Sequence, residues 1–190
     1  MNLFWFIFLV TSVVGLVILF LLIILFLITF AYGAASAAPW VPVLQKDVSR
    51  LLKIAKLQPG QTIYDLGCGD ARVLIQAAKE YGTLGVGYEI ALLPYLIAQL
   101  KISLAGVRSK VKVYYKNFWH QSIQPADVVY CYLMPNSLEK LKSKFQTELA
   151  PQAKIVSYAF RLHWLTPTVI DRPTDKFIPI YLYTKIVQPD

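Results

Sequence analysis

Residues 64–72 of the chain read Tyr64-Asp65-Leu66-Gly67-Cys68-Gly69-Asp70-Ala71-Arg72. A short apolar run, Thr62 to Leu66, precedes the two glycines, and an amphipathic helical pattern follows from Ala71 to Tyr81. A strand that turns through glycines into a helix begins an open α/β sheet, and such sheets bind ligands beyond the carboxyl ends of their strands. The two glycines let the backbone turn tightly, and the N–H groups at the helix start can bind a carboxylate. The stretch therefore predicts both the fold class and the position of a ligand site.

An acidic residue ends the next predicted strand, which runs from Leu84 to Ile90 and contains Gly85-Val86-Gly87-Tyr88-Glu89. Glu89 lies 20 residues after Gly69, the spacing at which dinucleotide-binding units carry the acid that holds ribose hydroxyls. NAD is the competing ligand, but its motif needs a further glycine where this chain has Arg72. Asp65 is instead suited to fixing the loop and contacting the ammonium group of S-adenosylmethionine. The residues expected to bind this cofactor are Asp65, Gly67, Cys68, Gly69, Asp70 and Glu89.

The remaining sequence continues the alternation of strands and helices. Further strands are expected at 111–115, 127–133 and 155–160, with helices at 92–104 and 138–149, and a β-hairpin at 168–187 that turns around 171–175. An amphipathic helix with Val48, Leu51, Leu52 and Ala55 on one side precedes the first strand, and Pro59-Gly60 stops it. The prediction is an α/β domain with a largely parallel sheet, helices on both faces and antiparallel strands at the end.

The N-terminal part of the chain has a different composition. No side chain from Met1 to Gln45 is charged, so all 19 Lys and Arg and all 11 Asp and Glu residues lie from Lys46 onward. Leu3 to Ala31 is almost continuously apolar and, at about 1.5 Å per helical residue, is long enough to cross a hydrocarbon layer of about 30 Å. Small residues at 34–38 would also suit a cleaved signal peptide, but the run is too long and lacks a basic start. We expect an anchor at 1–33, a Pro/Ala linker at 34–46 and the catalytic domain at 47–190.

The charges predict orientation and exclude some partners. Lys46, Arg50, Lys53 and Lys56 follow the span against Asp47 alone, which predicts an outside N-terminus and a cytoplasmic domain in a single-pass membrane protein. No Arg-rich presequence is visible, which favours a prokaryotic cell membrane over a mitochondrial inner membrane. The net charge of +8 suits anionic lipid, an acidic protein or nucleic acid, but no basic block with interleaved aromatics supports specific nucleic-acid binding. The cysteines and histidines have no spacing that suits a metal ion.

The motifs resemble those of the class I, seven-β-strand methyltransferases, which have a Rossmann-like sheet. More closely, they resemble the membrane-anchored protein lysine methyltransferases that modify the c subunit of ATP synthase and the adenine nucleotide translocase. The matching segments are Pro39-Trp40-Val41-Pro42, the glycine loop, residues 85–89, Lys116-Asn117-Phe118-Trp119, and Ala159-Phe160 through Trp164. Two positions depart from the family: Ala71 replaces the usual third glycine, and Asn117 stands where an Asp is common. The resemblance implies S-adenosylmethionine as cofactor and lysine N-methylation of a protein in or near the membrane.

Further site residues are expected after the third and fourth strands. Asn117 and Phe118 can bracket adenine, although Phe118 is equally suited to the core. The fourth strand leads into Tyr132, Pro135 and Asn136, at the place where many enzymes of this fold hold the target nitrogen, so we assign these three to the substrate side. Asn136 is alternatively the N-cap of the following helix.

Three functions are compatible with these observations. The leading hypothesis is a protein lysine methyltransferase that acts on a membrane protein. The second is a methyltransferase for a membrane-soluble small molecule such as a quinone or lipid. The third is a non-enzymatic cofactor-binding scaffold, against which the intact Gly67, Gly69 and Glu89 argue.

Overall fold

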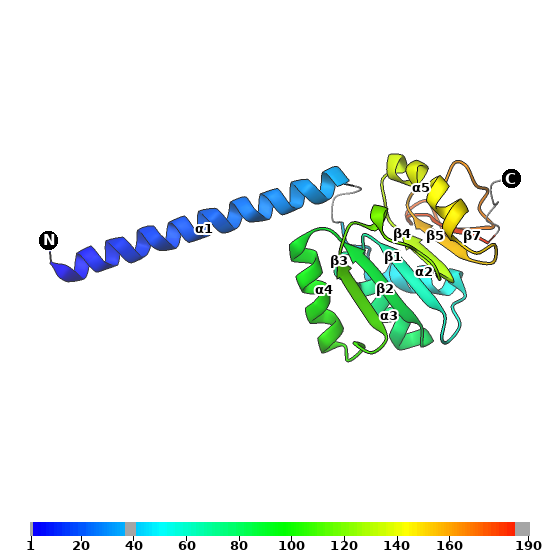
Figure 1. Ribbon diagram of the computed structural model, residues 1–190, viewed down its shortest axis with the longest axis horizontal. Helices are drawn as coiled ribbons and strands as arrows, with labels where there is room; N and C mark the ends of the chain where they lie inside the picture. Colours follow the sequence, from blue (N-terminus) through cyan, green and yellow to red (C-terminus); the bar gives the residue numbers. More distant parts are fainter. Residues whose placement is uncertain (1, 37–40, 185–190) are drawn as a thin grey trace.

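A seven-stranded sheet forms the centre of the domain, in the order β3-β2-β1-β4-β5-β7-β6. The computed structural model describes residues 2–36 and 41–184 (Figure 1). The strands are β1 (Thr62–Leu66), β2 (Leu84–Glu89), β3 (Val111–Tyr115), β4 (Val128–Cys131), β5 (Lys154–Tyr158), β6 (Val169–Asp171) and β7 (Ile180–Tyr183). The helices are α1 (Leu3–Ser36), α2 (Gln45–Ala55), α3 (Arg72–Tyr81), α4 (Leu92–Leu104), α5 (Pro135–Glu148) and the short 3-10 helix η1 (Phe118–His120).

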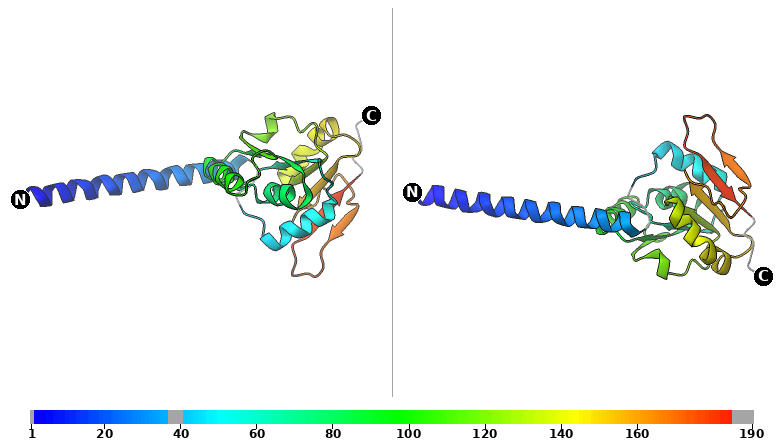
Figure 2. Two further views of the ribbon diagram at one scale, coloured as in Figure 1. Left: turned by 90° about the horizontal axis from the view of Figure 1, so that it is seen from below. Right: turned by 90° about the horizontal axis from the view of Figure 1, so that it is seen from above.

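The sheet is parallel from β3 to β5, and β7 pairs antiparallel with both β5 and β6. Helices α2, α3 and α4 cover one face and α5 covers the other (Figure 2), with an apolar core on each side. The predicted fold class, including helices on both faces and the terminal hairpin, is therefore confirmed. Because β1, β2 and β4 are parallel neighbours, their carboxyl ends lie together at one edge of the sheet, where the site is expected.

Three predicted boundaries were wrong for local reasons. Helix α3 begins at Arg72 because Ala71 adopts a left-handed conformation with φ of 60°. Strand β4 begins at Val128 because Asp127 instead accepts a hydrogen bond on its carboxylate from the Thr62 N–H at 2.7 Å. Strand β5 ends at Tyr158 because Ala159 has a positive φ of 69°.

Helix α1 leads into the domain from one side (Figure 1). Its residues Leu3–Ile28 are long and apolar enough to cross a membrane by length and composition. The helix continues to Ser36, and α2 begins at Gln45. Pro39 and Trp40, which belong to the motif at the start of the resemblance, lie outside the described residues.

Candidate active site

The glycine loop is attached to the end of β2 by backbone hydrogen bonds. Gly67 and Gly69 have positive φ values of 85° and 53°, a conformation that favours glycine. The N–H groups of Gly67 and Cys68 both donate to the Tyr88 carbonyl oxygen at 3.0 Å. The loop therefore bends back over the strand that supplies Glu89.

Gly87 makes this close approach possible, and the sequence analysis did not assign it a role. A Cβ at Gly87 would lie 2.7 Å from the Cys68 Sγ and 2.9 Å from the Leu74 Cδ1. Such distances are shorter than real side-chain contacts, so the loop and α3 can pack on β2 only when this position has no side chain. The signal was visible as a second glycine in the middle of a strand, where it weakens pairing unless a close approach requires it.

Glu89 holds the glycine loop directly. Its Oε2 accepts a hydrogen bond from the Gly69 N–H at 2.8 Å, and its Oε1 accepts from the N–H groups of Ile90 and Ala91, also at 2.8 Å. Burial raises the pKa of Glu89, and these three backbone donors partly oppose the shift. A carboxylate has about four acceptor positions, so one remains on Oε2 for a ligand hydroxyl.

Asp65 is a buried carboxyl at the end of β1. Among the described residues no hydrogen bond reaches its side chain, and burial, followed by the charges of Glu89 and Asp70, raises its pKa well above the usual value. Its register neighbour on β4 is Tyr130, a buried tyrosine whose hydroxyl also has no partner in the described part of the chain. Two unpaired polar groups at the carboxyl ends of adjacent strands provide acceptors for a ligand ammonium group.

Asp70 points away from this acceptor pair. Its carboxylate forms a bidentate ion pair with the Arg72 guanidinium, with its closest contact at 2.7 Å, and a second ion pair with the Lys101 ammonium group. Burial raises the pKa of Asp70, but these two cations outweigh the effect and leave it lowered. The predicted role of Asp70 in cofactor binding remains a prediction, and its observed contacts fix the start of α3 against α4.

Cys68 is buried between the loop and β2. Burial, followed by the negative charges of Asp65 and Glu89, raises the pKa of its thiol well above the usual value. The thiol therefore stays protonated and acts as a small apolar packing group, so any contact of Cys68 with the cofactor is through its backbone.

The residues after β3 form η1. The Asn117 Oδ1 caps this helix by accepting from the Trp119 N–H at 3.1 Å, and one lone pair of that oxygen remains for a ligand. Phe118 is buried in the core beneath α5, beside Tyr64 and Tyr88. The adenine contacts predicted for Asn117 and Phe118 remain predictions, and the observed packing of Phe118 favours the core alternative.

Aromatic side chains surround the carboxyl ends of β4 and β5. The Tyr132 ring packs edge-on against Tyr158, with centroids 4.8 Å apart, and lies nearly parallel to Phe160 at 6.5 Å. Pro135 begins α5, and the exposed Asn136 follows it. The alternative that Asn136 is the N-cap was wrong, because Met134 holds that position and its carbonyl oxygen accepts from Ser137 and Leu138.

Residues 65–169 match the family described as the ANTKMT methyltransferase domain. The matched range covers more than half of the chain and includes the glycine loop, Glu89 and Tyr132. The chain belongs to this methyltransferase family.

Curated relatives of this methyltransferase are named for lysine methylation. It is 36% identical over 148 residues to a protein-lysine N-methyltransferase of Saccharolobus islandicus, covering 76% of this chain and 92% of the relative. It is 32% identical to the adenine nucleotide translocase lysine N-methyltransferase of Mus musculus, covering 73% of this chain and 60% of that protein. It is 29% identical to the Xenopus laevis lysine N-methyltransferase that is named for the c subunit of ATP synthase, over 72% and 60%. The chain thus spans about 60% of the length of these two vertebrate relatives.

Solved structures with the same fold contain the demethylated cofactor. An RNA methyltransferase from Salinibacter ruber in complex with S-adenosyl-L-homocysteine superimposes with a TM-score of 0.75 and 29% identity, covering 79% of this chain and 97% of that one. An S-adenosylmethionine-dependent methyltransferase from Thiobacillus denitrificans, with the same ligand, has a TM-score of 0.56 and 21% identity over 62% and 49% of the chains, and shows the fold alone. The cofactor of this methyltransferase is S-adenosylmethionine, as the sequence predicted.

The described site residues fit this cofactor. The acceptor left on Glu89 suits a ribose hydroxyl, and the unpartnered Asp65 and Tyr130 suit the ammonium group of the methionine part. When bound, the cofactor supplies an electrophilic methyl group on a sulfonium. The protein's task is then to place a neutral nucleophile in line with that methyl group and to receive its proton.

Proposed function

We propose that this methyltransferase methylates lysine side chains of a protein substrate at a membrane surface. The observation that carries the proposal is the likeness to the archaeal protein-lysine N-methyltransferase, because it runs over 92% of that protein. The likeness therefore includes the substrate side of the domain as well as the cofactor loop.

The aromatic group at the ends of β4 and β5 supports a lysine substrate. Tyr132 and Phe160 present ring faces beside Tyr158, and rings of this kind pack well on an aliphatic stem that carries a cationic end. Pro135 and Asn136 begin α5 next to this group, so they are placed to contact the residues that flank the target lysine. We assign all of these contacts to the substrate.

The chain's organisation supports a membrane location. Residues 1–33 would form the anchor, 34–46 the linker and 47–190 the methyltransferase domain. The basic residues that follow the span, Lys46, Arg50, Lys53 and Lys56, favour a cytoplasmic domain and an outside N-terminus. The absence of an Arg-rich start in the sequence favours a prokaryotic cell membrane.

The test incubates membranes that contain the 190-residue protein with radiolabelled S-adenosylmethionine. Protein, extracted lipid and RNA are then separated, and the protein fraction is hydrolysed to its amino acids. We expect the label in a protein band that survives delipidation and nuclease treatment, and in methylated lysine after hydrolysis. Glu89→Ala should abolish the signal, whereas Glu80→Ala, an exposed change on α3, should retain it.

Each other distribution of label would overturn the proposal in a defined way. Label in the lipid phase would indicate a quinone or lipid substrate. Label lost on nuclease treatment would indicate RNA, which the Salinibacter ruber relative is named for. No label, together with retained cofactor affinity, would indicate a scaffold without activity.

A further inference from the structure

Helix α4 carries an exposed row of leucines. Leu93, Leu96, Leu100 and Leu104 are 38%, 52%, 60% and 78% exposed. Their spacing of three and four residues places them on one side of the helix, opposite the buried Pro94, Ala98 and Ile102. Among the helices of the domain within the described residues, α4 alone has exposed leucines, so the row is a specific feature of this helix.

Positive charge surrounds the leucine row. Between Ile90 and Ala126 the chain has no Asp or Glu, and all its Lys and Arg residues in this range are exposed: Lys101, Arg108, Lys110, Lys112 and Lys116. The neighbouring edge strand β3 adds two exposed aromatic side chains, Tyr114 and Tyr115. The outer face of α5 differs, because it mixes Glu139 with Lys140. A combination of leucines, lysines and tyrosines without acids is typical of a surface that lies in the interface of an anionic bilayer.

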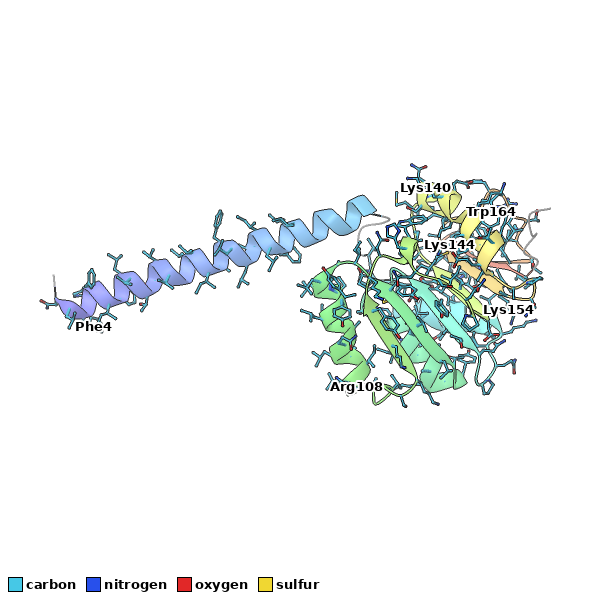
Figure 3. The ribbon with its side chains drawn as sticks, viewed as in Figure 1. Phe4, Arg108, Lys140, Lys144, Lys154 and Trp164 are labelled. Atoms are coloured by element: carbon cyan, nitrogen blue, oxygen red, sulfur yellow. The ribbon has the colours of Figure 1, made fainter. Side chains whose placement is uncertain are left out.

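The placement of α1 directs this surface toward the membrane. Helix α4 contacts α1. It lies on the side of the domain from which α1 extends and runs across the direction of α1 in Figures 1 and 2. If α1 crosses the bilayer, α4 is parallel to the bilayer surface and next to it. Figure 3 shows Arg108 just beyond the end of α4, whereas Lys140 lies on α5 at the other side of the domain.

We propose that α4, with β3 beside it, is a lipid-docking surface that inserts its leucines among the headgroups of an anionic membrane. The leucines supply apolar area, and the lysines pair with the lipid phosphates. Docking fixes the rotation of the domain about α1. It thereby holds the carboxyl ends of the strands, where the active site lies, at a constant height above the membrane. The inference rests on the proposed anchoring by α1, and the experiment below separates the two.

The test uses the 190-residue chain, one molecule per lipid nanodisc, with a fluorophore on one introduced cysteine. The native Cys68 and Cys131 are buried, and the unsubstituted chain measures their background labelling. The probe positions are Leu100→Cys on α4, Lys140→Cys on α5 as the matched surface control, and Leu16→Cys in α1. Lipids with brominated acyl chains quench a fluorophore that enters the bilayer. The discs contain phosphatidylcholine with or without phosphatidylglycerol.

We expect strong quenching at Leu16 and Leu100 and none at Lys140 in discs that contain phosphatidylglycerol. Quenching at Leu100 should fall about threefold or more without the anionic lipid, since each basic residue near an anionic surface contributes to attraction. Charge reversal by Lys110→Glu with Lys112→Glu should reduce it similarly, whereas Lys140→Glu with Lys142→Glu should not.

Three outcomes would overturn the inference. Quenching at Leu16 but not at Leu100 would leave the anchor intact and reject docking. No quenching at either position would reject the anchor as well. Protection of Leu100 that appears only when two chains share a disc would show that the leucines bind a second copy.

Discussion

The carboxylate of Glu89 accepts a hydrogen bond from the backbone N–H of Gly69 at 2.8 Å, across 20 residues of sequence. The acid therefore has two functions, because it can bind the ribose and it also fixes the loop that holds the methionine part. Since Ile90 and Ala91 occupy its other oxygen, the carboxylate cannot rotate without losing hydrogen bonds. The two halves of the cofactor site are coupled through one side chain.

Replacing Glu89 should damage cofactor binding more than its single remaining acceptor site suggests. Glu89→Ala removes a charged acceptor worth about 1.5–3 kcal/mol per hydrogen bond, so we expect affinity to fall ten- to a hundredfold. Glu89→Gln keeps the shape but turns an amide N–H₂ toward a backbone N–H, and an intermediate loss is expected. Titration calorimetry with S-adenosylhomocysteine measures both, with Glu80→Ala as the control. Undiminished affinity in Glu89→Ala would reject the assigned site.

Cofactor binding should depend on pH through Asp65. Its pKa is raised well above the usual value, first by burial, whereas a bound ammonium group favours the ionised form. Binding should therefore release a proton, and affinity should increase as pH rises toward the raised pKa. Calorimetry in buffers with different ionisation enthalpies measures the proton, and Asp65→Asn should abolish its release. An unchanged proton count in this variant would show that another group titrates.

The same pKa shift has the opposite consequence for stability without cofactor. A carboxyl whose folded pKa is raised stabilises the fold below its unfolded pKa of about 3.9, and this contribution is lost as pH rises through the folded value. Asp65→Asn should therefore increase the free energy of unfolding of the apoprotein at neutral pH while weakening cofactor binding. Chemical denaturation in detergent, at acid and neutral pH, measures the change. A variant that is less stable at both pH values would contradict this account.

The sequence was sufficient for those features that depend on local pattern. The apolar run before Gly67 predicted β1 with the observed bounds, and the periodic apolar residues predicted α4. Features that depend on contacts distant in sequence were not predictable in this way. Asp70 looked like a ligand residue, but Lys101, 31 residues away, pairs with it. The role of Gly87 depends on how closely Cys68 approaches β2, which only the packed structure shows.

Ala71 should tolerate glycine, whereas a helical alanine should not. Ala71 has φ of 60°, a conformation that costs a residue with a Cβ about 1–2 kcal/mol, and glycine relieves that cost. The relief offsets the lost methyl burial and the greater entropy of unfolded glycine, so Ala71→Gly should change stability by less than about 1 kcal/mol. The control is Ala77→Gly in α3, which is equally buried and should cost about 2 kcal/mol. Equal losses in both variants, measured by chemical denaturation, would show that the conformation of Ala71 carries no strain.

Adding a methyl group at Gly87 should impair both folding and cofactor binding. A Cβ there would lie 2.7 Å from the Cys68 Sγ, whereas the nearest contact of a Cβ at Gly85 is 3.2 Å, to the Leu74 Cβ. Overpacking costs about 1–3 kcal/mol, so Gly87→Ala should be destabilised more than Gly85→Ala. It should also weaken cofactor binding, because the displaced Cys68 belongs to the glycine loop. Equal affinity in the two variants would mean that the loop does not depend on this contact.

The hydroxyl of Tyr158 should contribute to stability through a buried acid. It donates to the Asp47 Oδ2 at 2.7 Å, while Arg50 donates to the other oxygen at 2.8 Å, so α2 is tied to the end of β5. Burial and then the bond to Asp47 raise the pKa of Tyr158, so the hydroxyl remains a donor over the physiological range. Tyr158→Phe removes this donor from a buried carboxylate and should cost about 1.5–3 kcal/mol.

The matched control for this change is Tyr181→Phe on β7, since the Tyr181 hydroxyl has no hydrogen bond among the described residues. It should alter the free energy of unfolding by less than about 0.5 kcal/mol. Because the Tyr158 ring packs edge-on against Tyr132 with centroids 4.8 Å apart, phenylalanine preserves that contact. Cofactor affinity should therefore stay within about twofold of wild type while stability falls, since no ligand hydrogen bond is lost. If affinity fell with stability, Tyr158 would have to act at the cofactor site as well as in the tie between α2 and β5.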